Sequence, residues 1–74
     1  MDKNKLFIYA LKTFRLSLGM TQTQFAEKAL VNEKYYGRIE RGESSPTLKI
    51  IIKIFDGLNI KTSDFLLLMY EHKD

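Results

Sequence analysis

The chain has 74 residues, enough for one small domain but not for a second hydrophobic core. It contains no cysteine, which excludes disulfides and cysteine-ligated zinc and leaves helix packing or oligomerisation to stabilise the fold. A hydrophobic fraction of 45% is typical of a folded globular chain, and a net charge of +3 is compatible with a nucleic-acid partner without identifying one.

No segment of the sequence predicts a membrane partner. The longest apolar run, residues 65–70, is far shorter than the roughly 20 residues needed to span a bilayer, and the N-terminus lacks a signal-peptide pattern. Linkers, repeats and low-complexity segments are also absent from the sequence. We therefore expect a cytoplasmic protein in which residues 1–74 form a single domain.

An apolar stripe with spacings of four, three and four residues predicts a first helix that ends at Gly19. The stripe consists of Phe7, Leu11, Phe14 and Leu18. Four more apolar side chains lie off the stripe, and they either extend the burial within the subunit or contact a partner. These are Leu6, Ile8, Tyr9 and Leu16.

A second, shorter helix is predicted over residues 22–29. Thr21 and Gln24 match a capping box, in which the two side chains satisfy backbone NH groups at a helix start. Because a helix of two turns is unstable alone in water, its neighbours must hold it. The residues expected to face those neighbours are Phe25, Ala26 and Ala29.

A third helix is predicted over residues 33–41. Asn32 is a suitable N-cap, and Gly42 ends the helix before a loop of turn-forming residues. Tyr36 and Ile39 are expected to face the core. The opposite face then presents Glu33, Lys34, Tyr35 and Arg38.

Two further helices complete an all-α fold, a compact bundle of five short helices. Thr47 is expected to cap the fourth helix, Asn59 to end it, and Thr62 with Asp64 to begin the fifth. Apolar positions run almost continuously around the fourth helix, so we expect it to be buried on more than one side. They are Leu48, Ile50, Ile51, Ile52, Ile54, Phe55 and Leu58. The last four residues are expected to fray.

The fourth and fifth helices carry more apolar surface than one subunit of this size is expected to bury. This surplus predicts a homodimer built from these two helices. The predicted interface consists of Ile50, Ile54, Phe55, Leu67, Leu68 and Met69.

The inventory of reactive side chains argues against an enzyme. There is one histidine, His72, which lies near the chain end, no cysteine nucleophile is present, and the acidic residues are scattered. Clustered metal ligands are also missing from the sequence. We therefore predict no catalytic residues, no metal site and no cofactor.

Four short motifs occur in an order and spacing that resemble a known family. They are Gly19-Met20-Thr21-Gln22, Phe25-Ala26, Ile39-Glu40-Arg41-Gly42 and Pro46-Thr47-Leu48. Over residues 7–60 the chain resembles the Cro/repressor-type helix-turn-helix domain of bacterial and phage regulators, the XRE family. This resemblance implies a lambda-repressor-like fold and a transcriptional regulator that binds double-stranded DNA.

Among stand-alone proteins of this size, the chain is most similar to the controller proteins of restriction-modification systems. Phage Cro-like repressors and some antitoxins share the same plan and remain alternatives. A protein-interaction module that neutralises a partner protein through the two C-terminal helices is the alternative from a different class of function.

The resemblance implies that the third helix enters the major groove and that the start of the second touches the phosphate backbone, where exposed NH groups favour an anion. It also implies a structural ion pair between Arg15 and Glu40. The implied DNA-contacting set is Gln22, Thr23, Asn32, Glu33, Lys34, Tyr35, Arg38, Arg41, Ser44 and Ser45.

The side chains of the third helix suit particular partners. Lys34 can donate to guanine O6 and N7. Glu33 can accept from a cytosine amino group, pair with Lys34 or Arg38, or weaken binding to incorrect DNA sequences by repulsion. Tyr35 can donate to phosphate or pack on a thymine methyl group or a deformable base step. A dimer of such units predicts an inverted-repeat operator, from which it would exclude RNA polymerase or recruit it as a further partner.

One residue departs from the family pattern. The turn between the second and third helices usually has glycine where this chain has Leu30. A left-handed backbone there would cost leucine roughly 1 to 2 kcal/mol, so the turn is either strained or differently shaped.

Overall fold

The computed structural model describes residues 2–71 as five α-helices connected by short loops, without a strand in that part of the chain. The all-α prediction is thereby confirmed. The helices are α1 (Lys3–Ser17), α2 (Gln22–Ala29), α3 (Glu33–Glu40), α4 (Leu48–Leu58) and α5 (Thr62–Glu71).

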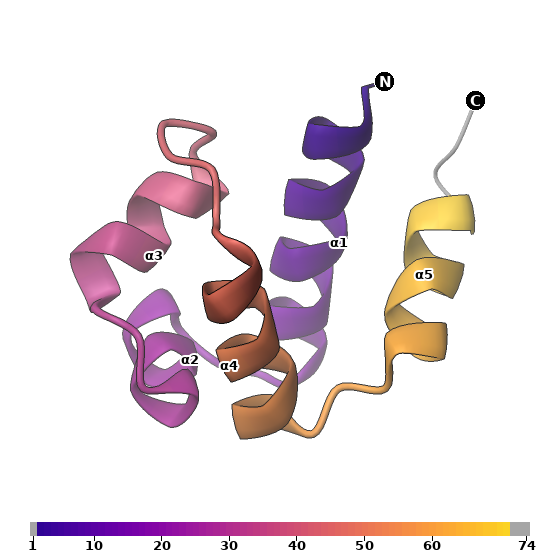
Figure 1. Ribbon diagram of the computed structural model, residues 1–74. Coiled ribbons are helices and arrows are strands. Elements are labelled where there is room, and N and C mark those ends of the chain that lie inside the picture. The colour runs from indigo at the N-terminus through magenta and orange to yellow at the C-terminus, as the bar shows by residue number, and fades with distance from the viewer. Residues whose placement is uncertain (1, 72–74) are drawn as a thin grey trace.

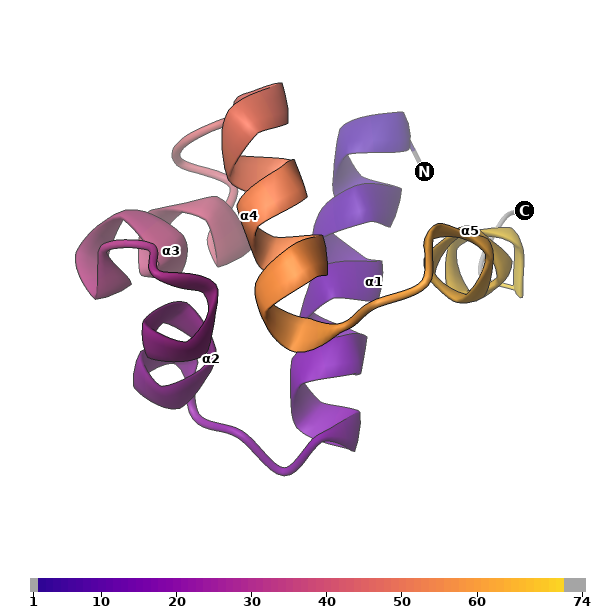
Figure 2. The same cartoon turned by 60° about the horizontal axis from the view of Figure 1, so that its bottom comes forward.

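α1 joins two parts of the molecule. α2 packs on α3 and α4, while α1 packs on α3 and on α5. Figure 1 accordingly shows α4 between the α2–α3 pair and α1, with α5 on the opposite side of α1. Figure 2, which looks along α5, shows that this last helix lies apart from α2 and α3. α1 and α4 therefore lie between α5 and the α2–α3 pair.

Side-chain caps fix the starts of the three central helices where the sequence predicted them. Thr21 and Gln24 form the capping box of α2, and Asn32 Oδ1 accepts a hydrogen bond from Tyr35 N at 3.0 Å. Thr47 Oγ1 accepts from Ile50 N at 3.2 Å to begin α4. α3 ends at Glu40, one residue earlier than predicted.

The core is built from aromatic and aliphatic side chains of all five helices. Its largest fully buried members are Tyr36, Phe25, Phe65, Leu11, Ile39 and Ile54. The rings of Phe25 and Tyr36 lie 5.1 Å apart and hold α2 against α3. Phe65 of α5 contacts the rings of Phe7, at 5.2 Å, and Phe55, at 4.9 Å.

The buried face of α1 differs from the predicted stripe. Leu18 is 45% exposed and caps the end of α1, whereas Leu6 and Ala10 are buried. The reason is that α3 and α5 both pack on α1, so its buried surface is wider and is turned relative to a single stripe.

As the apolar surplus predicted, one subunit does not bury α4 on several sides. Only Ile54 and Leu58 of α4 are buried, while Leu48 is 72% exposed and Ile52 is 51% exposed. Ile54 has no exposed surface, so its assignment to the dimer interface was wrong and it belongs to the core of the subunit.

Gly57 of α4 permits the close packing of α2 on α4. A Cβ at this position would lie 2.7 Å from the backbone oxygen of Lys28 and 2.8 Å from the Cα of Ala29. These are backbone atoms, which a side chain could not displace without moving the helix. The end of α2 is therefore seated directly on the α4 backbone.

Of the two turn shapes considered for Leu30, the structure has the left-handed one, with φ 59° and ψ 41°. The Leu30 side chain is 80% exposed. We expect Leu30→Gly to stabilise the domain by about 1 kcal/mol, because removing the left-handed strain outweighs the greater flexibility of the unfolded chain. Urea denaturation measures the difference. Asn59, at φ 55°, is the matched control, because asparagine tolerates this conformation and Asn59→Gly should gain less. A loss of stability in Leu30→Gly would contradict the assignment of strain.

Candidate nucleic-acid interface

The turn between α2 and α3 sets the angle of the helix pair. Leu30 N donates to Glu27 O at 3.1 Å and Val31 N to Ala26 O at 2.9 Å, which closes the end of α2. Val31 is buried, and Asn32 then begins α3 as its N-cap. The chain thus reverses within three residues and leaves one face of α3 in solvent.

A buried ion pair lies behind α3. Arg15 Nε donates to Glu40 Oε2 at 2.7 Å and Arg15 Nη2 to Glu40 Oε1 at 3.0 Å, a bidentate arrangement. The side chains are only 9% and 2% exposed. Arg15 Nη1 also donates to the backbone oxygen of Met20 at 2.9 Å. The structure therefore brings together the two residues of the predicted ion pair and bonds Arg15 to the chain before α2.

Gln22 extends this cluster to the start of α2. Its Nε2 donates to Glu40 Oε1 at 3.1 Å, so the first residue of α2 is bonded to the last residue of α3. The family resemblance implied that Gln22 contacts DNA but did not identify Glu40 as its partner. The spacing of 18 residues carries no local signal for such a bond.

Burial and charge perturb the titration of this cluster. Burial is the largest single influence and acts to raise the pKa of the Glu40 carboxyl, but the neighbouring donors and the charge of Arg15 together outweigh it and hold that pKa below its usual value. Burial, followed by the nearby Glu40 carboxylate, raises the pKa of the Tyr36 hydroxyl far above its usual value. That hydroxyl is buried without a hydrogen-bond partner among the described residues, which sequence reasoning did not anticipate.

The outward face of α3 is polar and partly ordered. Glu33, Lys34 and Arg38 are exposed, and Tyr35 is half-buried against the core. The guanidinium carbon of Arg38 lies 5.6 Å from the centroid of the Tyr35 ring, within cation–π range. Two of the predicted contact residues therefore form one unit on the exposed side of the helix.

The loop after α3 is attached to this unit. Glu43 N and Ser44 N donate to the backbone oxygen of Arg38 at 2.8 and 3.3 Å. Arg38 Nε also lies 3.4 Å from Ser44 Oγ, and the Tyr35 hydroxyl donates to Ser45 O at 3.3 Å. Loop and helix accordingly present their polar groups on one surface.

Arg41 lies beside Gln22 over a glycine of α3. A Cβ at Gly37 would be 3.1 Å from Arg41 Nη1 and 3.3 Å from Gln22 Oε1. Arg41 also pairs with Glu43, a residue missing from the predicted set, at 2.8 Å, and this lowers the pKa of the Glu43 carboxyl. Both side chains are 54% exposed, so the pair is open to competing ions.

The remaining predicted residues occupy different places. Thr23 is exposed on the first turn of α2, and Asn32 is exposed but uses its side chain as a cap. Leu67 is 58% exposed on α5, while the other retained members of the predicted dimer interface are half-buried against the core of their own subunit. These are Ile50, Phe55, Leu68 and Met69. His72 lies outside the described residues.

No metal centre is visible in residues 2–71, since no three His, Cys, Asp or Glu side chains gather there. None of the helices in this part of the chain has the length and apolar character needed to cross a membrane.

Two short helices joined by a three-residue turn, with one face of the second in solvent, define a helix-turn-helix domain. A family model of this class, HTH_3 (helix-turn-helix), matches residues 11–65. The chain therefore belongs to the helix-turn-helix family, and the resemblance to Cro/repressor-type domains is confirmed.

Known relatives fit this assignment. The HTH-type transcriptional regulator SutR of Escherichia coli (strain K12) is 41% identical over 56 residues, which are 76% of this chain and 32% of SutR. The chain thus spans about a third of that relative.

Solved structures of the restriction-modification controller protein C.Esp1396I cover more of the chain. The wild-type structure has a TM-score of 0.85 at 26% identity over 96% of this chain and 94% of the other. The structure of a single-residue mutant has a TM-score of 0.86, at 26% identity and over 96% of both chains. These relatives are transcriptional regulators and controller proteins, not enzymes.

Proposed function

We propose that the protein is a transcriptional regulator that binds specific double-stranded DNA as a homodimer. The observation that carries this proposal is the shared surface of the helix pair. Lys34 and Arg38 are the exposed cations of α3. Gln22 at the start of α2 and Arg41 after the end of α3 approach each other over Gly37 of the same helix. Groups suited to reading bases and groups suited to binding phosphate are thus available on one side of the helix pair.

Arg38 and Lys34 are suited to base readout in the major groove. Arginine is the commonest bidentate donor to guanine O6 and N7, and the contacts with Tyr35 and Ser44 restrict the rotamers of Arg38 before binding. For Glu33, the first residue of α3, the proposed role is to accept from a cytosine amino group. Tyr35 has its hydroxyl occupied by Ser45, which favours contact between its ring and DNA.

Phosphate contacts are proposed for the groups around this helix. Gln22 and Thr23 lie in the first turn of α2, where backbone NH groups and the helix dipole favour an anion. Arg41 can exchange Glu43 for a phosphate because their ion pair is exposed. Ser44 and Ser45 belong to the loop attached to α3 and would contact the neighbouring strand.

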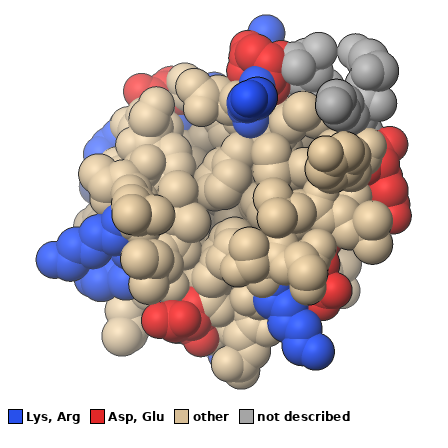
Figure 3. All heavy atoms as spheres, turned by 45° about the vertical axis from the view of Figure 1, so that its right-hand side comes forward, with Lys and Arg blue, Asp and Glu red and all other residues tan. Residues whose placement is uncertain are grey.

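The homodimer is proposed to form through α4 and α5. Large apolar side chains of these helices remain exposed in the subunit, namely Leu48, Ile52, Leu66, Leu67 and Tyr70. Figure 3 shows the face on the side of α5, where charged side chains stand mainly at the edges around an uncharged middle. Such a surface is rare on a small monomer and typical of an interface.

We expect DNA selected by this protein from random duplexes to contain an inverted repeat. Two recognition helices in a dimer lie about 34 Å apart, which places the half-site centres roughly 10 to 11 base pairs apart. Selection followed by footprinting measures this spacing. In the same assay Lys34→Ala and Arg38→Ala should each weaken binding without unfolding the domain, because both side chains are exposed. A consensus without dyad symmetry, protected by a monomer, would contradict the dimeric model.

We further propose that the protein is a restriction-modification controller in the cytoplasm. The support is the match over nearly the full length of both chains to C.Esp1396I. Binding near a promoter would exclude RNA polymerase or recruit it, according to the position of the site. Adjacent endonuclease and methyltransferase genes would support this assignment, whereas a toxin gene would favour an antitoxin and a phage genome a Cro-like repressor.

A module that neutralises a partner protein is the second candidate, because the same exposed apolar surface of α4 and α5 suits a different protein equally well. Titration with random duplex DNA at low salt separates the two functions. A helix-turn-helix that binds DNA shows salt-sensitive non-specific affinity, and a pure protein adaptor shows none.

A further inference from the structure

A second basic surface lies beside the helix pair, in a groove between the first half of α1 and the end of α3. The groove has a volume of about 950 Å³. Ile8 and Gly42 approach each other in it, since a Cβ at Gly42 would lie 4.0 Å from Ile8 Cδ1. Its cationic lining consists of Lys3, Lys5, Lys12 and Arg41. We call this surface the basic groove.

The carboxylates of the basic groove are already engaged within the protein. Asp2 Oδ1 accepts a hydrogen bond from Lys5 N at 2.8 Å as the N-cap of α1. Glu40 is bound by Arg15 at 2.7 Å. Asp2 keeps its charge because its partner is a neutral amide, but the three lysines outnumber it, so the ligand of the groove should be an anion with more than one charge.

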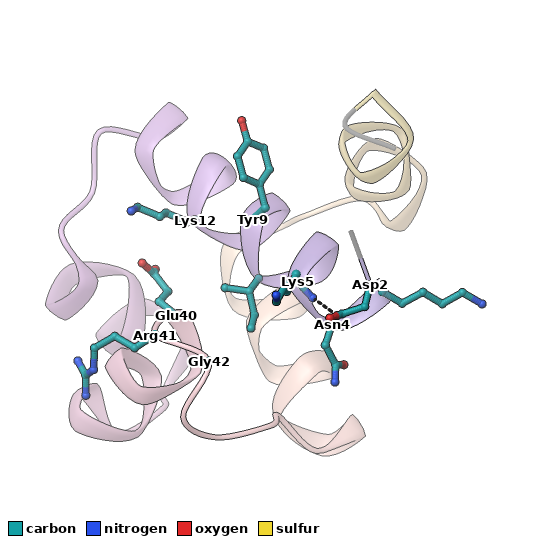
Figure 4. A pocket seen from close by; sticks show the side chains of 10 residues that line it. Asp2, Asn4, Lys5, Tyr9, Lys12, Glu40, Arg41 and Gly42 are labelled. Carbon is teal, nitrogen blue, oxygen red and sulfur yellow. Dashed lines mark hydrogen bonds between the residues drawn. The ribbon is translucent and has the colours of Figure 1, made fainter. Parts of the chain in front are cut away.

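The basic groove is continuous with the proposed phosphate site of α2. Figure 4 shows Lys12 on one side of Glu40 and Arg41 on the other, with Lys5 and Tyr9 further along α1. Arg41 Nη1 and Gln22 Oε1 lie over the same position of α3, as described above. A DNA strand that ran from the start of α2 toward α1 would pass Arg41, Lys12 and Lys5 in turn.

We propose that the basic groove binds the sugar-phosphate backbone outside the half-site read by α3, through Lys5 and Lys12. This inference rests on the proposed DNA-binding function. Duplex DNA fits because it carries one charge per about 1.7 Å of its axis and extends beyond any half-site. Lys5 and Lys12 are both exposed and two turns apart on α1, so they can follow one strand. The contact adds affinity without adding base preference.

The test compares two lengths of the selected inverted repeat, with about two or about ten base pairs beyond each half-site, using the double variant Lys5→Gln and Lys12→Gln. On the long duplex the variant should lose up to four phosphate contacts per dimer, and its slope of log affinity against log salt should be shallower by about 3 to 4. On the short duplex its slope should match that of the control variant.

The control is Lys53→Gln with Lys61→Gln, which removes the same charge from exposed positions outside the groove. Equal slopes for the two double variants on the long duplex would overturn the proposal and leave an acidic protein segment as the ligand of the groove. Failure of the wild-type protein to bind either duplex would overturn the proposed function itself, and this inference with it. Circular dichroism at each salt concentration verifies that both variants are folded.

Discussion

Replacing Glu40 with glutamine is expected to destabilise the domain by about 3 to 5 kcal/mol, because it removes one partner of a buried ion pair. The Arg15 guanidinium would remain buried without a counter-charge, and the new amide NH₂ group would face its donors. A domain of this length has a total stability of roughly 4 to 11 kcal/mol, so the variant should be partly unfolded at moderate temperature. Denaturant unfolding measures the loss.

A second ion pair, also within residues 2–71, provides the matched control. Glu43→Gln removes the same charge from a pair of similar length with Arg41, but both of those side chains are 54% exposed. Its unfolding midpoint should stay close to that of the wild type because solvent screens the pair. Equal losses in the two variants would show that burial of the Arg15–Glu40 pair has no special role.

The pH dependence of stability gives an independent check. The pKa of Glu40 is lower in the folded state than its ordinary value of 4.5, so the unfolded chain binds its proton more readily. The stabilisation is therefore complete above pH 4.5 and is lost as the pH falls through the lower folded pKa. Glu40→Gln should remove this component, and its stability should change less over that acidic range.

Replacing Leu67 with aspartate is expected to convert the proposed dimer into a monomer. The carboxylate would be placed in the proposed apolar interface, where burying a charge without a partner is unfavourable. Two DNA-binding domains linked in a dimer bind an operator more tightly than two separate domains, because binding of the first raises the effective concentration of the second. The operator affinity of the variant should therefore fall by roughly 10² to 10⁴. Sedimentation and DNA titration measure the two effects separately.

The control for this variant is a more exposed leucine outside the two helices. Leu30 is 80% exposed at the turn between α2 and α3, and Leu30→Asp adds the same charge at a position that is not part of α4 or α5. It should leave the sedimentation of the protein unchanged. A wild-type protein that is already monomeric at micromolar concentration would exclude the dimer, whatever the variants do.

Local signals in the sequence were sufficient to predict the five helices and most of their ends. The capping box of Thr21 and Gln24 places the start of α2 at the correct residue, because both hydrogen bonds close within one turn. Leu30 stands where the family pattern has glycine, so the sequence indicated either a strained turn or a turn of another shape. Only the structure shows that Leu30 adopts the left-handed conformation.

The choice of buried face was less predictable. α4 has apolar side chains on nearly every side, so periodicity alone cannot select Ile54 for the core and leave Leu48 and Ile52 exposed. That choice depends on α2, which approaches α4 at Gly57. The bond from Gln22 to Glu40 and the basic groove were unpredictable for the same reason, since each depends on how distant helices meet.

The position of α1 has a consequence for how such a regulator can change during evolution. α1 contacts α3 on one side and α5 on the other, and Phe65 of α5 packs on the ring of Phe7 at 5.2 Å. In a dimer joined through α5, the volume of these rings sets the distance between the two recognition helices, while Lys34 and Arg38 are untouched. Under the proposed function, operator spacing and base preference would be encoded by separate residues, and either could drift while the other is conserved.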